Sequence, residues 1–335
     1  MRVGLTYDLR DDYRAMGMSE EDTAEFDSID TINGLDNALQ ELGFEVDRIG
    51  HIKALAARLV AGERWDIVFN IAEGVHGRGR EAQVPALLEA YDQPYVFSDS
   101  VTCGVTLDKA LTKAVVSAAG VPTTPHAIIA RAGDAAAVQL GFPLFIKPVA
   151  EGTGKGCEPS CKISNADELE INSQRLLERF KQPVIVEPFL PGREFTVGVL
   201  GTDDNAYILA VMEVVLLEKA EAEIYTYFNK ENFKSLVNYK LADDAAALQA
   251  ADAALAAHQA LSCRDASRVD LRCDESDVPR FMELNPLAGI HPQHSDLPIM
   301  AKLSGMSYEI LIGRIMASAL QRYGLTPPAE LTRAA

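Results

Sequence analysis

Short apolar stretches alternate with segments of helical spacing through the first hundred residues, and this alternation strongly constrains the fold. Strand-like and helix-like segments in such an order predict a parallel sheet with helices on its faces. Ligands of such sheets bind at the carboxyl ends of the strands. The predicted strands are Val3–Tyr7, Glu45–Ile49 and Trp65–Asn70, and the predicted helices are Asp30–Leu42, Ile52–Ala61 and Ala82–Tyr91.

The chain changes character near residue 107, after which strands follow one another with fewer helices between them. This pattern predicts an α+β arrangement in the second half of an α/β protein. The segment Glu218–Leu241 is polar and irregular. The predicted strands are Ala127–Ala130, Leu144–Pro148, Val184–Glu187, Glu194–Leu200 and Tyr207–Val215, and the predicted helices are Asp108–Ala119, Ala166–Phe180, Asp243–Leu261 and Ser307–Tyr323.

Three oxygen-bearing side chains lie on what the pattern predicts to be two neighbouring strands of a hairpin. Asp270 is flanked by Val269 and Leu271, so its side chain points away from these apolar neighbours. Glu283 and Asn285 are two residues apart and share one face of the following strand. Oxygen ligands without a nearby His or Cys suit Mg²⁺, which completes its shell with phosphate oxygens and water. The alternative is an ordinary hairpin with solvated acids.

A lysine on an apolar strand comes just before a glycine-rich loop. Lys147 lies within Leu144–Pro148, and a lysine on a buried strand requires an anion. In Glu151–Gly156 three glycines alternate with other residues, which allows close backbone approach and an anion-binding nest. The loop fits neither the Walker nor the dinucleotide pattern. Together with the hairpin acids, the lysine and the loop predict a triphosphate site.

The stretch Val184–Phe195 runs from one strand through a turn into the next. A backbone hinge of this kind can hydrogen-bond the edge of an adenine ring. Glu187 and Glu194 carry acceptors for the exocyclic amine and the ribose hydroxyls. Surface acids on a hairpin are the alternative interpretation of these two residues.

In this order, these segments resemble an ATP-grasp enzyme, specifically the D-alanine–D-alanine ligase family. The resemblance covers most of residues 1–325 and implies an ADP-forming carboxylate–amine ligase that works through an acyl phosphate. It also implies an N-terminal parallel-sheet domain (1–104), a central subdomain (105–186) and a C-terminal subdomain (187–335). The segments that carry it are Thr106–Lys113, Ile146–Gly156, Glu187–Thr196, Tyr225–Lys230, Arg268–Asp270 and Glu283–Asn285.

The resemblance implies roles for individual residues. ATP would contact Lys109, Lys147, Gly154, Lys155, Gly156, Glu187, Leu190 and Glu194. Two Mg²⁺ ions, or Mn²⁺, would bind Asp270, Glu283 and Asn285. The implied catalytic residues are Arg268 on the tetrahedral intermediate, Lys230 on a closing loop, Glu25 as anchor of the first amino acid, and Thr153 in the glycine loop.

The sequence departs from the family pattern in the segments that the resemblance implies to bind the substrate. Glu73 stands in place of a histidine, and Glu231 follows the loop lysine where a tyrosine is usual. A stretch with two histidines and an acid, Gly289–Asp296, replaces a serine-rich, uncharged one. We predict a substrate other than D-alanine, with Glu73, Gly289, His291 and Ser295 as substrate residues. A genuine D-alanine–D-alanine ligase of cell-wall synthesis and a catalytically idle nucleotide-binding protein are the alternatives.

Charge and cysteine usage limit the partners. The net charge of −18 argues against nucleic acid. No apolar run approaches the roughly 20 residues of a membrane span, and the N-terminus lacks a signal-peptide pattern. Five scattered cysteines fit a cytoplasmic protein; Cys157 and Cys161 are either two free thiols, the favoured interpretation, or part of a zinc site. We expect a cytoplasmic homodimer whose partners are ATP and small-molecule carboxylate and amine substrates.

Overall fold

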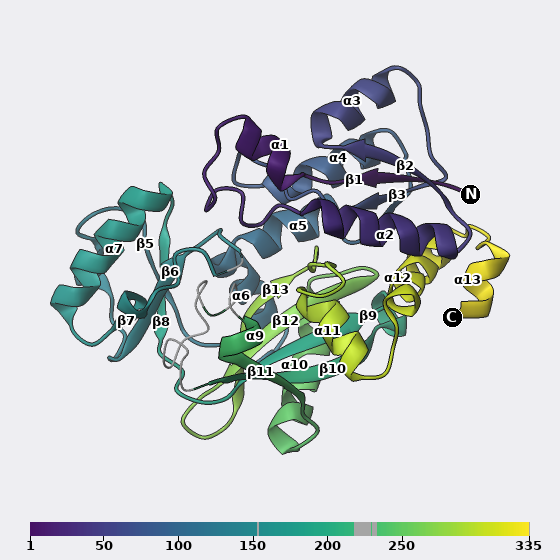
Figure 1. The fold of residues 1–335 in the computed structure, drawn as a ribbon. Helices are drawn as coiled ribbons and strands as arrows, with labels where there is room; N and C mark the ends of the chain where they lie inside the picture. Colours follow the sequence, from purple (N-terminus) through teal and green to yellow (C-terminus); the bar gives the residue numbers. More distant parts are fainter. Residues whose placement is uncertain (153, 218–228, 230–232, 335) are drawn as a thin grey trace.

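The computed structural model describes residues 1–152, 154–217, 229 and 233–334, which form three sheets with helices packed around them (Figure 1). The first sheet lies at the top of Figure 1, the second at the left and the third at the bottom. Two predicted catalytic residues, Thr153 and Lys230, lie outside the described residues, as does most of the segment Glu218–Leu241.

The first sheet is parallel and has the strand order β2-β1-β3-β4. Side chains alternate between its two faces. On β3, Ile67 and Phe69 belong to a core that contains α2, whereas Val68 belongs to a second core that contains α3 and α4. The predicted parallel sheet with helices on its faces is therefore confirmed. Its elements are β1 (Arg2–Thr6), α2 (Ile29–Glu41), β2 (Glu45–Gly50), α3 (Ile52–Val60), β3 (Ile67–Asn70), α4 (Gln83–Ala90) and β4 (Tyr95–Val96).

The second sheet is antiparallel, in the order β5-β8-β6-β7, and helix α7 packs against it. Leu169 and Leu176 of α7 share a buried cluster with Leu144 and Ile146 of the sheet. Asn165 caps the helix by accepting a hydrogen bond from the Glu168 N–H, which is why α7 begins where it does. The elements are β5 (Ala127–Ile129), β6 (Leu144–Pro148), β7 (Lys162–Ile163), α7 (Ala166–Phe180) and β8 (Val184–Pro188).

The third sheet is antiparallel, in the order β11-β10-β9-β12-β13, and helix α10 packs along one face of it. Alanines such as Ala250 and Ala254 let the helix approach the strands closely. On the other face, Leu297 and Met300 of α11 pack with Met212 of β10. The elements are β9 (Glu194–Leu200), β10 (Tyr207–Leu216), α9 (Phe233–Leu236), β11 (Val237–Leu241), α10 (Ala245–Ala260), β12 (Ala266–Cys273), β13 (Pro279–Asn285) and α11 (Asp296–Leu303).

The C-terminal helices return to the first sheet. Ile312 and Ile315 of α12 (Tyr308–Arg322) and Leu331 of α13 (Ala329–Ala334) share one core with β1 and α2. Figure 1 accordingly shows the two chain ends on the same side of the molecule. The hydrophobic core thus joins the N-terminal sheet to the third sheet, and the predicted domain boundaries stay a prediction.

Several elements differ from the sequence-based prediction. Helix α1 (Arg10–Ala15) follows β1 where no helix was predicted, and a further unpredicted helix, α5 (Ser100–Leu107), precedes α6 (Lys109–Ala118). The end of the segment predicted to be irregular is strand β11, which pairs with β10. Every helix among the described residues is too short or too polar to cross a bilayer.

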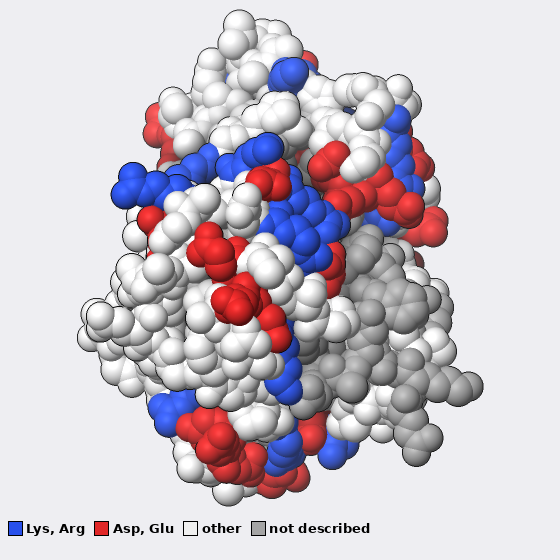
Figure 2. Space-filling model, turned by 90° about the vertical axis from the view of Figure 1, so that its left-hand side faces the viewer, with Lys and Arg blue, Asp and Glu red and all other residues white. Residues whose placement is uncertain are grey.

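Figure 2 shows the side of the molecule that carries α7, where basic and acidic side chains lie beside one another. Arg175 and Arg179 both pair with Glu158, and Arg179 also pairs with Glu21. These two arginines are therefore neutralised locally. The absence of a nucleic-acid partner stays a prediction.

Candidate active site

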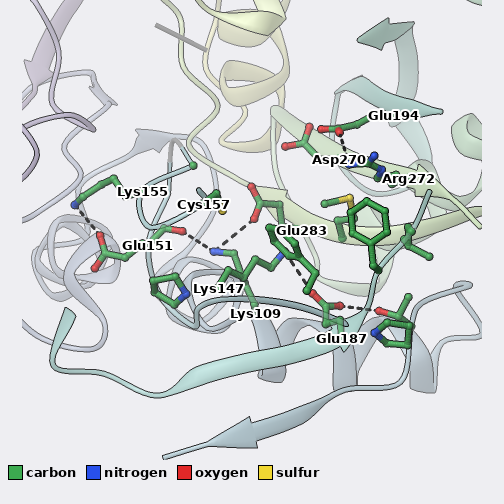
Figure 3. A pocket seen from close by; sticks show the side chains of 18 residues that line it. Lys109, Lys147, Glu151, Lys155, Cys157, Glu187, Glu194, Asp270, Arg272 and Glu283 are labelled. Carbon is green, nitrogen blue, oxygen red and sulfur yellow. Dashed lines mark hydrogen bonds and ion pairs between the residues drawn. The ribbon is translucent and has the colours of Figure 1, made fainter. Parts of the chain in front are cut away.

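A cavity opens between the second and third sheets, and side chains from both sheets line it (Figure 3). It encloses about 850 Å³, counting the open space at its mouth, which is within the usual range for a cofactor or ligand site. The residues predicted to bind ATP line this cavity, with the exception of Gly156, and so do two predicted metal ligands: Lys109, Lys147, Gly154, Lys155, Glu187, Leu190, Glu194, Asp270 and Glu283.

Lys147 and Glu187 form a buried ion pair in the cavity wall. The Nζ atom of Lys147 on β6 lies 3.5 Å from Oε2 of Glu187 on β8. The other Glu187 oxygen accepts a hydrogen bond from Thr124 and lies 2.6 Å from Nζ of Lys113. Burial opposes both charges, but Glu187 and Glu283 raise the pKa of Lys147, and Lys113 and Lys147 lower the pKa of Glu187 to about 2. Lysine and glutamate are therefore both charged at neutral pH.

Lys109, at the start of α6, links the glycine loop to the hairpin. Its Nζ donates to the Glu151 carbonyl at 2.6 Å and lies 3.5 Å from Oε2 of Glu283 (Figure 3). Lys155 pairs with the Glu151 carboxylate at 2.6 Å. Gly156 has φ +75°, and a Cβ there would lie 2.8 Å from Pro148, so this glycine packs the loop against β6. Two lysines thus face the cavity from the loop and the helix beside it.

The β12–β13 hairpin places the predicted metal ligands side by side. Asp270 pairs with Glu283, and Arg268 pairs with Asn285, in the antiparallel ladder. The register then shifts, so that Met282 is an extra residue on β13. This bulge lets Met282 and Glu283 both line the cavity. The pairing of β12 with β13 confirms the sequence-based expectation that Asp270 and Glu283 lie on adjacent strands.

The oxygen atoms of the hairpin fit a magnesium ion chemically. Oδ2 of Asp270 accepts from Arg268 at 3.1 Å, whereas its Oδ1 is buried and makes no hydrogen bond with the described residues. Oδ1 of Asn285 accepts from the Leu287 N–H and retains a second lone pair. A buried carboxylate oxygen without a donor favours a cation. The donor set is two carboxylates and one amide, which is typical of Mg²⁺ bound together with phosphate.

Glu25, the predicted anchor of the first amino acid, is engaged by the protein itself. Its Oε2 accepts from Arg80 at 2.7 Å, and its Oε1 accepts from the Gly152 N–H at 2.5 Å. Arg80 also donates to the Ala150 carbonyl at 3.0 Å. Burial opposes the charge on Glu25, but Arg80 and then Lys155 hold its pKa below the usual value. This network ties the N-terminal loops to the glycine loop.

Glu73 and Glu81 lie near that ion pair. The pKa of Glu73 is raised well above its usual value by burial, and then by Glu81 and Glu25. Burial raises the pKa of Glu81 to about 7, although Arg80 works in the opposite direction. The sequence drew attention to Glu73 alone. Glu81 was missed because an acid in a loop has no pattern that separates it from a solvated one.

The other predicted substrate residues lie on the turn before α11. The Ser295 hydroxyl accepts from the His291 N–H at 2.9 Å, and a Cβ on Gly289 would lie 2.8 Å from the same hydroxyl. The rings of His291 and His294 meet edge to face at 4.5 Å. Burial and the neighbouring His294 lower the pKa of His291, so its ring is neutral at pH 7. Gly289 and Ser295 thus fix the shape of this turn.

Arg272 is a cavity residue that the sequence analysis missed. Its Nη1 atom lies 3.4 Å from Oε2 of Glu194, and its guanidinium lies 5.3 Å from the centre of the Phe189 ring. The signal that could have found it is the period of two in a strand. Arg268, Asp270 and Arg272 alternate, so all three side chains point to one face.

Comparisons with known proteins agree with this geometry. Residues 115–317 match the family model described as D-ala D-ala ligase C-terminus. D-alanine–D-alanine ligase from Gluconobacter oxydans is 35% identical over 290 residues, which are 85% of this chain and 91% of that protein. This chain belongs to the D-alanine–D-alanine ligase family. Protein y4sG from Sinorhizobium fredii is 33% identical over 265 residues, 77% of this chain and 75% of that protein.

Solved structures agree with this assignment in fold. D-alanine–D-alanine ligase from Bacillus anthracis superposes with a TM-score of 0.73 at 21% identity, covering 97% of this chain and 99% of that one. The ATP-grasp fold implied by the family resemblance is therefore confirmed. The family model matches the part of the chain that contains β6, β8 and the hairpin, but it does not match Glu25, Glu73 and Arg80. The family model therefore covers the strands on the nucleotide side of the site but not the N-terminal loops.

The Asp27 carboxyl, near the predicted substrate turn, provides a test by pH. Burial raises its pKa to about 7, against the opposing effects of Thr31 and Arg10. The folded state therefore holds this proton more tightly than the unfolded state, and stability falls as the pH rises from about 4 through 7. We expect Asp27→Asn to gain about 2 kcal/mol of stability relative to the parent chain between pH 5 and pH 8. Urea unfolding at the two pH values measures the difference.

Asp252 is the matched control, because it is an exposed acid on α10. Asp252→Asn should shift stability equally at both pH values. The raised pKa of Asp27 would be contradicted if Asp27→Asn changed the free energy of unfolding by the same amount at pH 5 and at pH 8.

Proposed function

We propose that this chain is an ATP-dependent, ADP-forming ligase that joins a carboxylate to an amine and prefers a substrate other than D-alanine. The observation that carries the ligase part is the cavity, where Lys109 and Lys147 face the paired carboxylates Asp270 and Glu283. Cations and metal-type acids on opposite walls suit a nucleotide triphosphate bound with its metal. The family's name supports ligation as the reaction.

We propose that the cavity divides into a phosphate side and an adenosine side. Lys109, Lys147 and Lys155 would hold the phosphates, with the backbone N–H groups of the glycine loop around them. On the other side, the hinge residues Leu190 and Glu194 would hold the adenosine. Glu187 would lie between the phosphate side and the adenosine side, because it forms an ion pair with Lys147.

We propose that two Mg²⁺ ions bind at the hairpin through Asp270, Glu283 and Asn285. Among the described residues no three acids, histidines or cysteines converge on one point. The protein would therefore supply few ligands, and phosphate oxygens would complete the shell, as is usual for this ion. When bound, Mg²⁺ neutralises charge on the transferring phosphoryl group.

The proposed reaction has two steps. An oxygen of the substrate carboxylate attacks the γ-phosphorus of ATP, which releases ADP and forms an acyl phosphate. The amine nitrogen then attacks the carbonyl carbon, phosphate leaves with the electron pair of the broken C–O bond, and the nitrogen loses a proton. The Arg268 guanidinium, charged and mostly buried, would stabilise the oxyanion between these events. Lys230 and Thr153 stay predicted catalytic residues.

The structure supports a substrate other than D-alanine through one contact. Arg80 occupies the carboxylate of Glu25, so an α-ammonium group would have to displace a buried guanidinium to reach it. Glu73 and Glu81 add further acids close by. A substrate with an additional cationic group, or with its amine in a different place, fits this surrounding better than D-alanine does.

ADP release tests the proposal directly. With D-alanine as the only amino acid, we expect turnover at least 100-fold below that of the best substrate pair found in a screen of amino acids, amines and other carboxylates. A kcat of about 10 s⁻¹, a median enzyme rate, with stoichiometric D-alanyl-D-alanine would contradict this expectation and establish the cell-wall ligase. ATP binding without ADP release for any pair would favour the idle nucleotide-binding protein.

The assembly and location of the protein remain predictions. We propose a homodimer in the cytoplasm, and light scattering of the purified chain would test the oligomeric state. The zinc alternative for Cys157 and Cys161 has no support in the structure, because no group of three or more histidines, cysteines and acids that could hold a metal lies together among the described residues.

A further inference from the structure

Arg272 and Glu194 face each other across two strands of the third sheet. They are register partners in the antiparallel ladder of β12 and β9, and both side chains line the cavity. Figure 3 shows their ion pair, in which Nη1 of Arg272 lies 3.4 Å from Oε2 of Glu194. The two side chains are 12% and 15% exposed. Because the backbone holds side chains on neighbouring strands close together, this pair is a built part of the cavity wall.

A second contact limits the motion of Arg272. Its guanidinium lies 5.3 Å from the centre of the Phe189 ring, a distance typical of a cation–π contact. Phe189 also lines the cavity, directly before the hinge residue Leu190. Nζ of Lys162, on β7, lies 4.4 Å from the centre of the same ring. Arg272 therefore connects a ring beside the hinge to the Glu194 carboxylate, and it restricts where that carboxylate can lie.

The Glu194 carboxylate can only accept hydrogen bonds, which limits the part of a nucleotide that it suits. The edge of an adenine ring offers an amine donor beside a ring nitrogen acceptor, and a backbone hinge matches this edge because it carries both donors and acceptors. The two neighbouring hydroxyls of a ribose offer two donors. Glu187, the other predicted adenosine acid, is already engaged by Thr124 and two lysines. Glu194 is therefore the acid that suits the ribose.

We propose that Arg272 is a positioning residue that holds the Glu194 carboxylate for the ribose hydroxyls, so that the cavity selects a ribonucleoside triphosphate over its deoxy forms. This inference rests on the proposed nucleotide site and names the sugar that the site takes. Without such a partner a long side chain occupies several rotamers, and ordering it on binding opposes the gain from new hydrogen bonds. Arg272 also offsets the charge of Glu194, which would repel a triphosphate, but this effect is the same for all three sugars. Selection between the sugars therefore reports the position of Glu194.

Nucleotide affinities test the proposal on the full chain. Isothermal titration calorimetry with Mg²⁺ measures Kd for ATP, 2′-deoxy-ATP and 3′-deoxy-ATP. We expect the parent chain to bind ATP about 10-fold more tightly than either deoxy form, which is the effect of one hydrogen bond to a charged group. Arg272→Met removes the guanidinium but keeps an unbranched side chain beside Phe189. It should weaken ATP binding and remove most of the preference for ATP.

Glu194→Gln shows whether Arg272 acts through Glu194. The amide keeps the shape of the side chain and removes its charge, so this variant should also lose most of the preference for ATP. Arg272→Met should then lower the preference no further in the Glu194→Gln background, because two residues that act through one interaction are not additive. A further loss as large as that in the parent background would contradict a positioning role.

Arg280→Met is the matched control. Arg280 lies opposite Arg272 on β13, pairs with Asp274 at 2.7 Å and is not among the described residues that line the cavity. Its substitution should leave all three Kd values unchanged. Equal Kd values for ATP and both deoxy forms in the parent chain would overturn the inference, even if the Arg272 variant failed to fold. So would a folded Arg272→Met variant with the parent's preference. No binding of ATP by the parent chain would instead overturn the proposed nucleotide site and the inference with it.

Discussion

Asp270→Asn should abolish ligation while leaving the fold intact. Asp270 pairs with Glu283 across the hairpin, and its buried Oδ1 has no donor among the described residues. An amide in its place keeps the shape but removes the charge that a metal ion requires. We expect kcat for ADP release to fall by about 10³, the upper range for removing one group that stabilises a transition state. Thermal unfolding should change little, since Arg268 keeps Asp296 as a partner.

Asp277 offers a matched control in the same hairpin. It is exposed in the turn, with φ +59°, a conformation that Asn adopts readily. Asp277→Asn should therefore retain full activity. An Asp270→Asn variant that releases ADP at the parent rate with saturating Mg²⁺ would refute the metal assignment. A loss of activity in both variants would indicate damage to the hairpin rather than to the metal site.

Lys147→Met should lower kcat/KM for ATP by about 100-fold through loss of a cation aimed at the phosphates. The side chain is 4% exposed and its charge is held by Glu187. Glu187 does not lose all of its partners in the variant, because Thr124 and Lys113 still contact its other oxygen. The variant should therefore fold, with its defect in nucleotide binding. Titration of ATP against the purified variant measures it.

Lys113→Met is the contrasting variant, because the two lysines share Glu187 but only Lys147 lines the cavity. Lys113 Nζ also donates to Thr123 and to the Phe281 carbonyl. Its removal leaves buried polar atoms without a partner, which typically costs about 3 kcal/mol. Lys113→Met should therefore unfold earlier in urea. Equal effects of the two substitutions on stability and on ATP binding would contradict this division of roles.

The elements that the sequence predicted best are those whose ends carry local signals. Leu144–Pro148, Ala166–Phe180 and Glu194–Leu200 have the predicted bounds. Their apolar spacing and their caps lie within the segments themselves. Helix α5 was missed because Ser100–Leu107 is rich in Val, Thr, Cys and Gly, which are weak helix formers. Strand β11 was missed because it is a short edge strand that follows a polar, irregular segment, and only its pairing with β10 makes it a strand.

The residues of the candidate site also fall into those that the sequence identified and those that it did not. Asp270 and Glu283 were found because a period of two assigns side chains to faces within a strand. Arg80 was not found as a site residue, since nothing near it in sequence shows what it contacts. Arg80 meets Glu25 from 55 positions away. Such contacts depend on how loops pack against one another, which no local spacing encodes.

The sequence by itself determined the classes of element, the kinds of charge near the nucleotide and the family to which the chain belongs. These follow from periodicity and residue chemistry, which act over a few neighbouring positions. Only the tertiary structure decided which charges cancel. It pairs Glu25, the predicted anchor of an amino acid, with Arg80, and it pairs Arg268, the residue predicted to act on the intermediate, with Asp270 and Asp296. Electrostatic interaction depends on distance in space and on burial, so these ion pairs form only when the folded chain brings the residues together.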